Sequence, residues 1–172
     1  MIRSTILAAI LLTAALVTAR AADPQVARGK YLVQFGGCTD CHTPGHFLGK
    51  PDSARFLGGS DVGFGIPGHG VFVGPNLTPD KETGLGNWSA QEIVTAIRTG
   101  KRPDGRMLAP VMPWRGFAGL TDADALSVAA FLKSLPPVSH KVAGPFGPNE
   151  TASVLVMAIV PGPAFAAQPQ PK

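Results

Sequence analysis

Apolar residues recur at helical spacing in three stretches of the chain, and each stretch has a recognisable start signal. Asp23-Pro24 places an N-cap acid before a proline at the first helical position. Ser89 and Glu92 form an S-x-x-E capping box, and Thr121 opens the third stretch as an N-cap. Glycine or proline ends each stretch. The predicted helices cover residues 24–35, 89–99 and 121–135.

Between these helices the chain is rich in glycine and proline, which favour turns and loops. Residues 43–83 are expected to be mostly loop, with one short hairpin around residues 64–73. Residues 101–119 form a second predicted loop. The tail after Pro137 carries one apolar run, residues 154–160, which is too short to span a membrane. We interpret this run as a strand or extended segment that packs on the domain.

The N-terminus has the pattern of a secretory signal peptide. Arg3 precedes an uncharged apolar stretch at residues 6–17, and Ala19, Arg20 and Ala21 have the small-x-small form of a cleavage site. An uncleaved membrane anchor is the alternative, but the apolar stretch is shorter than the roughly 20 residues of a spanning helix. The sequence therefore predicts an exported, periplasmic protein with no integral membrane span after cleavage.

Composition narrows the classes of protein further. Removing Arg3 and Arg20 with the signal peptide lowers the Lys and Arg count from 15 to 13 against 11 acidic residues, a net charge of +2. No basic block is interleaved with aromatic residues, so a nucleic-acid partner is not expected. The 21 glycines and 17 prolines make up about a quarter of the mature chain, a level at which loops dominate. With two cysteines in all, such a chain needs another apolar body at its centre, and a large cofactor would serve.

The candidate chemistry lies in the segment Cys38-Thr39-Asp40-Cys41-His42. Its two thiols are three residues apart, on one face of a helical turn, and the imidazole follows at once. In an exported protein this is the attachment motif for c-type haem. The thiols form thioethers to the two vinyl groups, while the adjacent histidine reaches the iron from the same side. The motif predicts one covalent haem c held through Cys38 and Cys41.

Three other uses of these residues fit less well. A disulfide between Cys38 and Cys41 would leave a loop-rich fold without a core. A thioredoxin-like redox pair needs a strand before the first cysteine, whereas a helix is predicted there. A zinc site needs four ligands, and Cys38, Cys41 and His46 have no credible fourth.

The sixth ligand of the haem iron separates electron transfer from ligand chemistry. The candidates are methionine and histidine side chains: Met107, Met112, Met157, His46, His69 and His140. The histidines lie too close to His42 or in polar segments flanked by glycine or proline. Prolines on both sides of the pair Val111-Met112 restrict the backbone, which would hold a thioether at small entropic cost. We therefore favour Met112, with ordinary core packing as its alternative use.

Several further motifs accompany the haem segment. They are Gly74-Pro75-Asn76-Leu77, Thr83-Gly84-Leu85-Gly86-Asn87-Trp88-Ser89, Arg98-Thr99-Gly100, Arg102-Pro103-Asp104-Gly105 and Met112-Pro113-Trp114. Over roughly residues 24–137 the chain resembles class I single-haem cytochromes c. Within this family it is similar to the cytochromes that serve bacterial periplasmic dehydrogenases for alcohols, sugars and aldehydes. The fold that the resemblance implies is all-α, with three main helices around a covalently bound haem, long loops and a C-terminal extension.

The resemblance also implies roles for individual residues. His42 is the proximal iron ligand and Met112 the distal one. The carbonyl of Pro75 is expected to accept the Nδ1 proton of His42, which fixes the orientation of the imidazole. Trp88 is expected near a haem propionate, with plain core packing as the alternative, and Gly29 is expected where the first and last helices cross, opposite an alanine. The predicted cofactor-binding residues are Cys38, Cys41, His42, Pro75, Trp88 and Met112, and the metal ligands are His42 and Met112.

The function implied by the resemblance is one-electron transfer in the periplasm, so the protein is expected to be an electron carrier and not an enzyme. It would accept electrons from a dehydrogenase and pass them to the respiratory chain, with a dehydrogenase, a terminal oxidase or another cytochrome as partner. A haem enzyme or gas-binding sensor with an open sixth site is the alternative, and a redox-inert disulfide protein is a third. The predicted organisation is a signal peptide at 1–21, a cytochrome c domain at 22–142 and a C-terminal extension at 143–172.

Overall fold

The computed structural model describes residues 23–167, so the predicted signal peptide lies outside the described residues. Three helices have ten or more residues: α1 (Pro24–Phe35), α3 (Ala90–Thr99) and α5 (Asp122–Ser134). Three are shorter: α2 (Cys38–His42), α4 (Trp114–Phe117) and α6 (Gly162–Ala166). Two 3-10 turns, His46–Leu48 and Ser53–Arg55, interrupt the loop after α2. Within residues 23–167 no helix is both long and apolar enough to cross a membrane.

The three longer helices begin at the predicted caps. The side chain of Asp23 accepts a hydrogen bond from the amide of Gln25, 2.8 Å away, and so satisfies a free donor at the start of α1. At α3 both halves of the capping box are present: Ser89 accepts from the Glu92 amide, and the Glu92 carboxylate accepts from the Ser89 amide. Thr121 caps α5 through its hydroxyl. These three predictions are confirmed.

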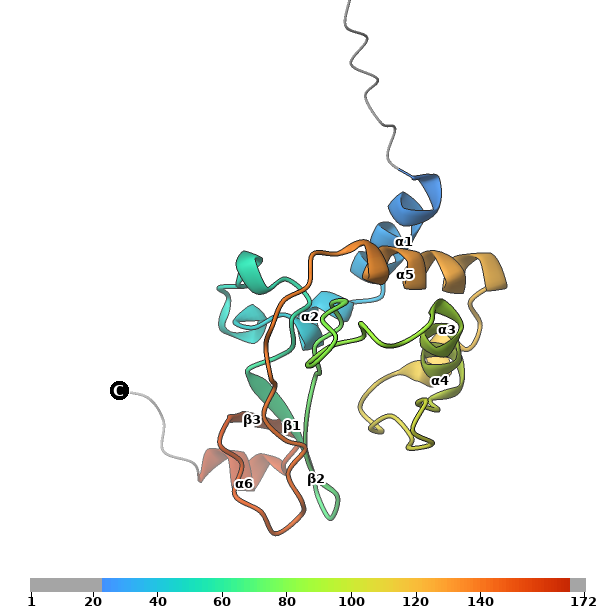
Figure 1. Ribbon diagram of the computed structural model, residues 1–172. Coiled ribbons are helices and arrows are strands. Elements are labelled where there is room, and N and C mark those ends of the chain that lie inside the picture. The colour runs from blue at the N-terminus through green and yellow to red at the C-terminus, as the bar shows by residue number, and fades with distance from the viewer. Residues whose placement is uncertain (1–22, 168–172) are drawn as a thin grey trace, which may run out of the picture.

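Helix α1 packs directly against α5, and α5 packs against α3 (Figure 1). Their contact surfaces supply most of a small apolar core, whose members are Val33, Leu57, Ile93, Val94, Ala125, Val128, Ala129, Phe131 and Leu132. Gly29 lies at the contact between α1 and α5, as expected. A Cβ atom there would overlap the carbonyl oxygen of Ser127 and lie 2.8 Å from the Cβ of Phe131. The three atoms nearest to such a Cβ belong to Ser127 and Phe131, and not to Ala129 or Ala130, the two alanines expected opposite Gly29.

We expect the substitution Gly29→Ala to destabilise the exported, haem-loaded protein by about 1–3 kcal/mol or more, since two helix backbones would have to separate. Urea unfolding followed by far-UV circular dichroism measures the change as a lower midpoint at an unchanged m-value. Gly162→Ala is the matched control, because a Cβ at that position meets no atom within 4 Å. The control is expected within about 0.5 kcal/mol of the parent. Equal midpoints for Gly29→Ala and the parent would show that the contact between α1 and α5 is not close.

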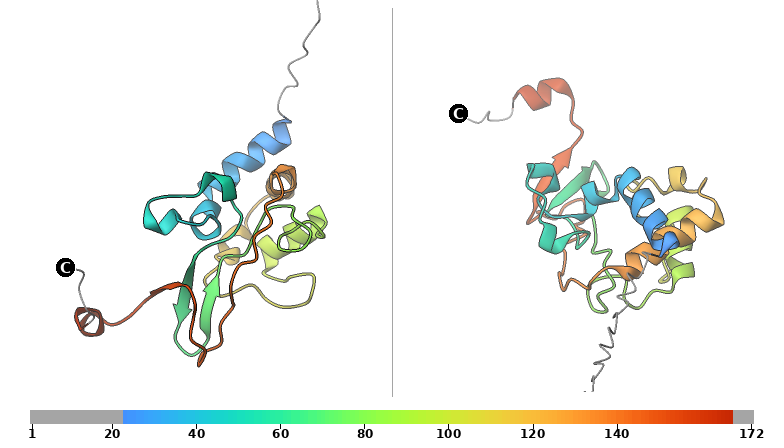
Figure 2. Two further views of the ribbon diagram at one scale, coloured as in Figure 1. Left: turned by 60° about the vertical axis from the view of Figure 1, so that its left-hand side comes forward. Right: turned by 90° about the horizontal axis from the view of Figure 1, so that it is seen from above.

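A three-stranded sheet lies at the far end of the molecule from the pair α1 and α5 (Figures 1 and 2). The predicted hairpin is present as β1 (Val62–Ile66) and β2 (Gly70–Val73), which pair antiparallel. The apolar run in the tail forms β3 (Leu155–Ala158), which pairs parallel to β1 and gives the order β2-β1-β3. The tail is thus attached to the body by backbone hydrogen bonds. This sheet is a feature that the expected all-α class does not include.

Candidate haem-binding site

A cavity of about 1,170 Å³ opens between α1, α3, α5, the hairpin and the loop before α4. It exceeds the roughly 300–1,000 Å³ typical of sites for small molecules. Most of its wall is apolar. All six predicted cofactor-binding residues line it: Cys38, Cys41, His42, Pro75, Trp88 and Met112. The size and the lining suit a large, mainly apolar cofactor.

The two cysteines reach the cavity because the chain turns sharply between α1 and α2. Gly37 adopts a left-handed conformation, with φ of 66°, which an L side chain rarely adopts. Both thiols are free in the structure. Burial raises the pKa of the Cys38 thiol to about 11, and burial together with the charge of Asp40 raises the pKa of Cys41. Both groups are therefore neutral thiols at pH 7, which is unlike the thiolates of redox-exchange or zinc sites.

His42 is buried, with 6% of the residue's surface exposed. Its Nδ1 lies 2.7 Å from the carbonyl oxygen of Pro75, which is the contact that the resemblance implied. Burial lowers the pKa of His42, and the Pro75 carbonyl opposes this by accepting a hydrogen bond. The ring is thus held neutral, with Nδ1 as the donor and Nε2 left as the atom able to bind a metal ion.

Close backbone packing brings Pro75 to His42. Gly74 lies against α2, where a Cβ would overlap the carbonyl oxygen of Cys41 and lie 3.3 Å from Nδ1 of His42. The amide of Gly59 donates a 2.8 Å hydrogen bond to the carbonyl of His42. The segments that contain Gly59 and Gly74 therefore both contact the end of α2. A side chain at position 74 would push the carbonyl of Pro75 away from His42.

Asn76 fixes the same segment from its other side. This side chain is 1% exposed, and its amide nitrogen donates to the hydroxyl of Thr83 (3.0 Å) and to the carbonyl of Val138 (2.7 Å). Its oxygen accepts from the amide and the hydroxyl of Thr78, at 2.9 and 2.7 Å. All the polar groups of a buried amide are satisfied, so the position of the segment after Pro75 is strongly determined. The sequence motif contained Asn76, but its role could be seen only in the structure.

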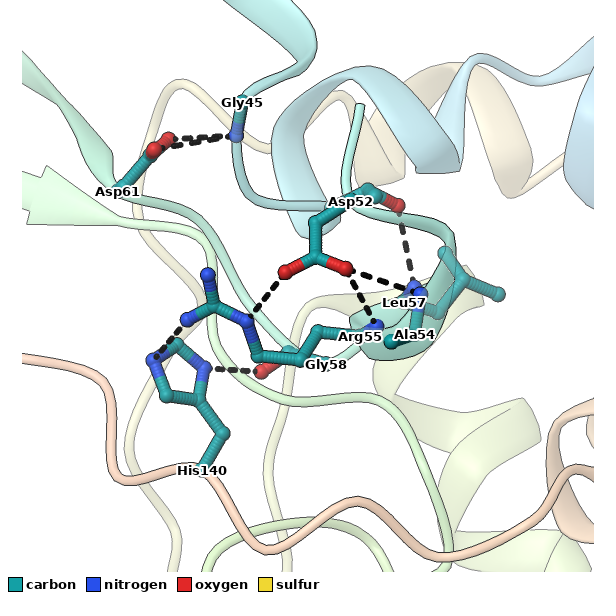
Figure 3. A network of polar contacts seen from close by, with 9 residues as sticks. Gly45, Asp52, Ala54, Arg55, Leu57, Gly58, Asp61 and His140 are labelled. Atoms are coloured by element: carbon teal, nitrogen blue, oxygen red, sulfur yellow. Dashed lines mark hydrogen bonds and ion pairs between the residues drawn. The ribbon is translucent and has the colours of Figure 1, made fainter. Parts of the chain in front are cut away.

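The loop at residues 43–61 is fixed to the chain that returns from α5 (Figure 3). His140 Nδ1 lies 2.7 Å from the carbonyl oxygen of Gly58, and Arg55 reaches His140 Nε2 at 3.5 Å. The carboxylate of Asp52 accepts a 2.7 Å hydrogen bond from Arg55, which lowers the pKa of Asp52. This loop therefore packs around the end of α2 as part of the body.

The predicted distal ligand lies on the loop between α3 and α4. Of the six candidate ligands, Met107 and Met112 line the cavity and the other four do not. Met107 is 56% exposed, whereas Met112 is half-buried. The Met112 amide donates to the carbonyl of Ala109 (3.0 Å), and the Trp114 amide donates to the carbonyl of Met112 (2.8 Å). The ring of Trp114 rests on Gly100, at the end of α3, so the loop that carries Met112 is attached to that helix.

A model of the family described as Cytochrome c matches residues 26–136, which is more than half of the chain. The chain belongs to the cytochrome c family. Among curated relatives, this cytochrome is 34% identical over 112 residues to the fructose dehydrogenase cytochrome subunit of Gluconobacter japonicus. It is 35% identical over 115 residues to the cytochrome c subunit of the quinone alcohol dehydrogenase of Gluconobacter oxydans. It is 36% identical over 128 residues to the gluconate 2-dehydrogenase cytochrome c subunit of Pantoea cypripedii.

These matches cover 63%, 66% and 74% of this cytochrome, and 22%, 22% and 27% of the respective relatives. The chain therefore spans about a quarter of the length of the relatives that it matches. Membership of the family implies a covalently attached haem c. The residues present fit that group, because the attachment motif, a buried neutral histidine and an apolar wall surround one large cavity.

The sequence patterns did not predict some of the residues that line the cavity of this cytochrome. Phe64 and Phe72 face each other in the hairpin register and line the cavity. Residues 142–145 line it as well, so the start of the tail contributes to the site. The phenylalanines lie in a predicted hairpin and so carried a weak signal. Nothing in the local sequence of residues 142–145 indicates their place, because it follows from the path of the chain after α5.

Proposed function

We propose that this cytochrome carries single electrons in the periplasm through one haem c attached at Cys38 and Cys41, with His42 and Met112 as axial ligands. The observation that supports this most strongly is the buried, neutral His42, whose Nδ1 is engaged by Pro75 while its Nε2 is left for a metal. Met112 lines the same cavity from a separate loop. The chain holds one Cys-x-x-Cys-His motif, which supports a single haem.

Each residue of the site has a different role in the proposed electron transfer. Bound haem c supplies reversible one-electron chemistry between ferric and ferrous iron. His42 is pre-oriented by Pro75, so its binding geometry is set before any ligand arrives. The thioether of Met112 would be a soft ligand that favours the ferrous state, and the apolar wall would exclude water and disfavour the more highly charged ferric state. The expected result is a comparatively high reduction potential with little rearrangement of the protein on electron transfer.

The proposed place and partners follow from the N-terminal pattern and from the relatives. A signal peptide at residues 1–21 would direct the protein to the periplasm. The relatives named above are cytochrome subunits of dehydrogenases, so a periplasmic dehydrogenase is the proposed electron donor. A terminal oxidase or another cytochrome is the proposed acceptor. Residues 22–142 would form the cytochrome domain, and residues 143–172 an extension that also contributes to the haem cavity.

A redox titration of the exported protein, followed by the addition of carbon monoxide to its reduced form, tests this function. We expect a reversible one-electron curve with one electron per chain, and an unchanged ferrous spectrum when carbon monoxide is added, because Met112 fills the sixth position. The measurement is the visible absorption at a series of applied potentials. Rapid formation of a carbon monoxide complex, or turnover of added peroxide, would instead support a haem enzyme or gas sensor with an open site.

A further inference from the structure

The strand in the tail, β3, has one edge that no other strand covers. Within residues 23–167 the sheet has the order β2-β1-β3, so β3 pairs with β1 along one edge and its second edge is open. Helix α6 stands away from the sheet, beyond the end of β3 (Figure 2). Every second residue of an edge strand directs its backbone N–H and C=O groups outward. β3 therefore presents hydrogen-bonding groups with which a further strand can pair.

The side chains of this segment are apolar and exposed. Residues 154–160 have the sequence Val-Leu-Val-Met-Ala-Ile-Val. Leu155 is 58% exposed and Ile159 is 93% exposed, and all four residues of β3 are exposed. Native proteins usually protect an edge strand with charged residues, but residues 151–171 contain no Lys, Arg, Asp or Glu. An exposed apolar strand without this protection indicates a surface that another protein chain covers.

The chemistry of the open edge favours a second copy of this chain as the occupant. The outward backbone groups need hydrogen-bond partners, which a strand supplies and a lipid tail does not. A second copy presents an edge of the same length and the same apolar character. Self-pairing meets no like-charge repulsion, because residues 151–171 are uncharged. A two-fold axis perpendicular to the sheet pairs the two strands antiparallel, and the assembly is complete with two copies.

The size of the surface indicates a weak dimer. Ten consecutive residues, 155–164, are exposed in each copy. A stable interface uses roughly 20–30 residues a side, whereas transient complexes of redox proteins use smaller surfaces. We therefore expect a reversible dimer with a dissociation constant between about 1 and 100 μM.

We propose that two copies of this cytochrome associate through β3, with residues 154–160 of each copy paired antiparallel about Met157. Opposite residues in an antiparallel pair lie on the same face of the sheet, so the residue at the two-fold axis faces its own copy. Met157 is the centre of the apolar run, so this register pairs apolar residues throughout. It also leaves out Pro161, which has no amide proton to donate. Leu155 then lies opposite Ile159 of the partner subunit.

The pairing would bring the two haem cavities close together. Met157 lies beside Phe64 in the register of β3 and β1, so both residues are on one face of the sheet. Phe64 and Phe72 line the cavity. The two-fold axis keeps this face on the same side in both copies, and the two β1 strands would be three strand spacings apart, about 14 Å. Two electron-carrying sites would then lie side by side, a consequence that rests on the proposed function, whereas the strand pairing does not.

Sedimentation velocity of the full-length, haem-loaded protein at a series of concentrations tests the pairing. We expect the parent to shift reversibly from monomer to dimer as the concentration rises. Two matched double variants test the register. Leu155→Lys with Ile159→Lys places like charges directly opposite each other, whereas Leu155→Lys with Ile159→Glu places opposite charges there. We expect the dissociation constant of the first variant to exceed that of the second by about tenfold at low salt, and the difference to shrink at high salt.

Both variants change exposed side chains outside the cavity wall, so they should keep the haem absorbance of the parent. A parent that stays monomeric up to about 1 mM, or equal dissociation constants for the two variants, would overturn the proposal. If the variants do not fold, hydrogen exchange of the parent decides: amides of residues 154–160 should exchange more slowly at high protein concentration, and unchanged exchange would contradict the pairing. Binding of a monomeric parent to phospholipid vesicles would assign β3 to a lipid surface and also overturn it.

Discussion

Replacing both Cys38 and Cys41 with serine is expected to remove all covalently bound haem and, with it, the cooperative fold. Helices α1, α3 and α5 supply eight of the nine buried apolar residues of the core, and beside it lies a cavity of about 1,170 Å³ with a mainly apolar wall. Without haem this wall would face water. Proteins are stable by only about 5–15 kcal/mol, and a chain so rich in glycine and proline has little to offset that loss. Haem absorbance after denaturation and thermal unfolding by circular dichroism measure the two effects.

Two controls accompany the double serine variant. Thr39→Ser changes the same short helix without touching a thiol and should keep the haem and the unfolding transition of the parent. Cys38→Ser leaves one thiol, Cys41, and should retain part of the haem through a single thioether. The account is wrong if the double variant unfolds as cooperatively as the parent in the absence of haem, since the cavity would then not need to be filled.

Replacing Met112 with alanine is expected to lower the reduction potential and to open the iron to external ligands. The thioether favours ferrous iron, so its loss should lower the midpoint by on the order of 0.2 V, within the roughly 0.8 V range that axial ligands control. Carbon monoxide should then bind the ferrous form rapidly. Potentiometric titration and stopped-flow absorption follow the two changes. Little loss of stability is expected beyond that of a half-buried side chain on a loop.

Met107→Ala is the matched control for Met112→Ala. Both methionines line the cavity from the same loop, but Met107 is largely exposed. The Met107 variant should keep the potential of the parent and remain closed to carbon monoxide. The opposite pattern, with Met107→Ala opening the iron and Met112→Ala having no effect, would move the distal ligand to Met107. It would leave the proposed carrier function intact.

Local signals predicted the helices of this cytochrome well. Asp23, Ser89 and Thr121 each accept a hydrogen bond from an amide two or three residues ahead, so the helix starts depend on residues adjacent in sequence. The hairpin and the strand in the tail were also expected from short apolar runs. The parallel pairing of β3 with β1 was not predicted, because it joins segments about 90 residues apart and no short pattern encodes the register.

The parts of the site that could be predicted are those that a short sequence motif indicates. The segment from Cys38 to His42 indicates its cofactor by spacing alone, and the contact with Pro75 followed from the resemblance. The fully bonded Asn76 and the phenylalanine pair in the hairpin are products of tertiary packing. Each depends on distances between segments that are remote in sequence. The sequence placed Asn76 in a motif and the two phenylalanines in a predicted hairpin, but it could not indicate their partners.

The central proposal is that His42 and Met112 would both bind the iron of a haem c held in this cavity. The ferric absorption spectrum of the exported protein tests it most directly, through the weak sulfur-to-iron charge-transfer band at the red end of the visible range. The account predicts this band in the parent and in Met107→Ala, and its loss in Met112→Ala. A haem-loaded parent without the band, with cyanide binding freely to its ferric iron, would contradict the account.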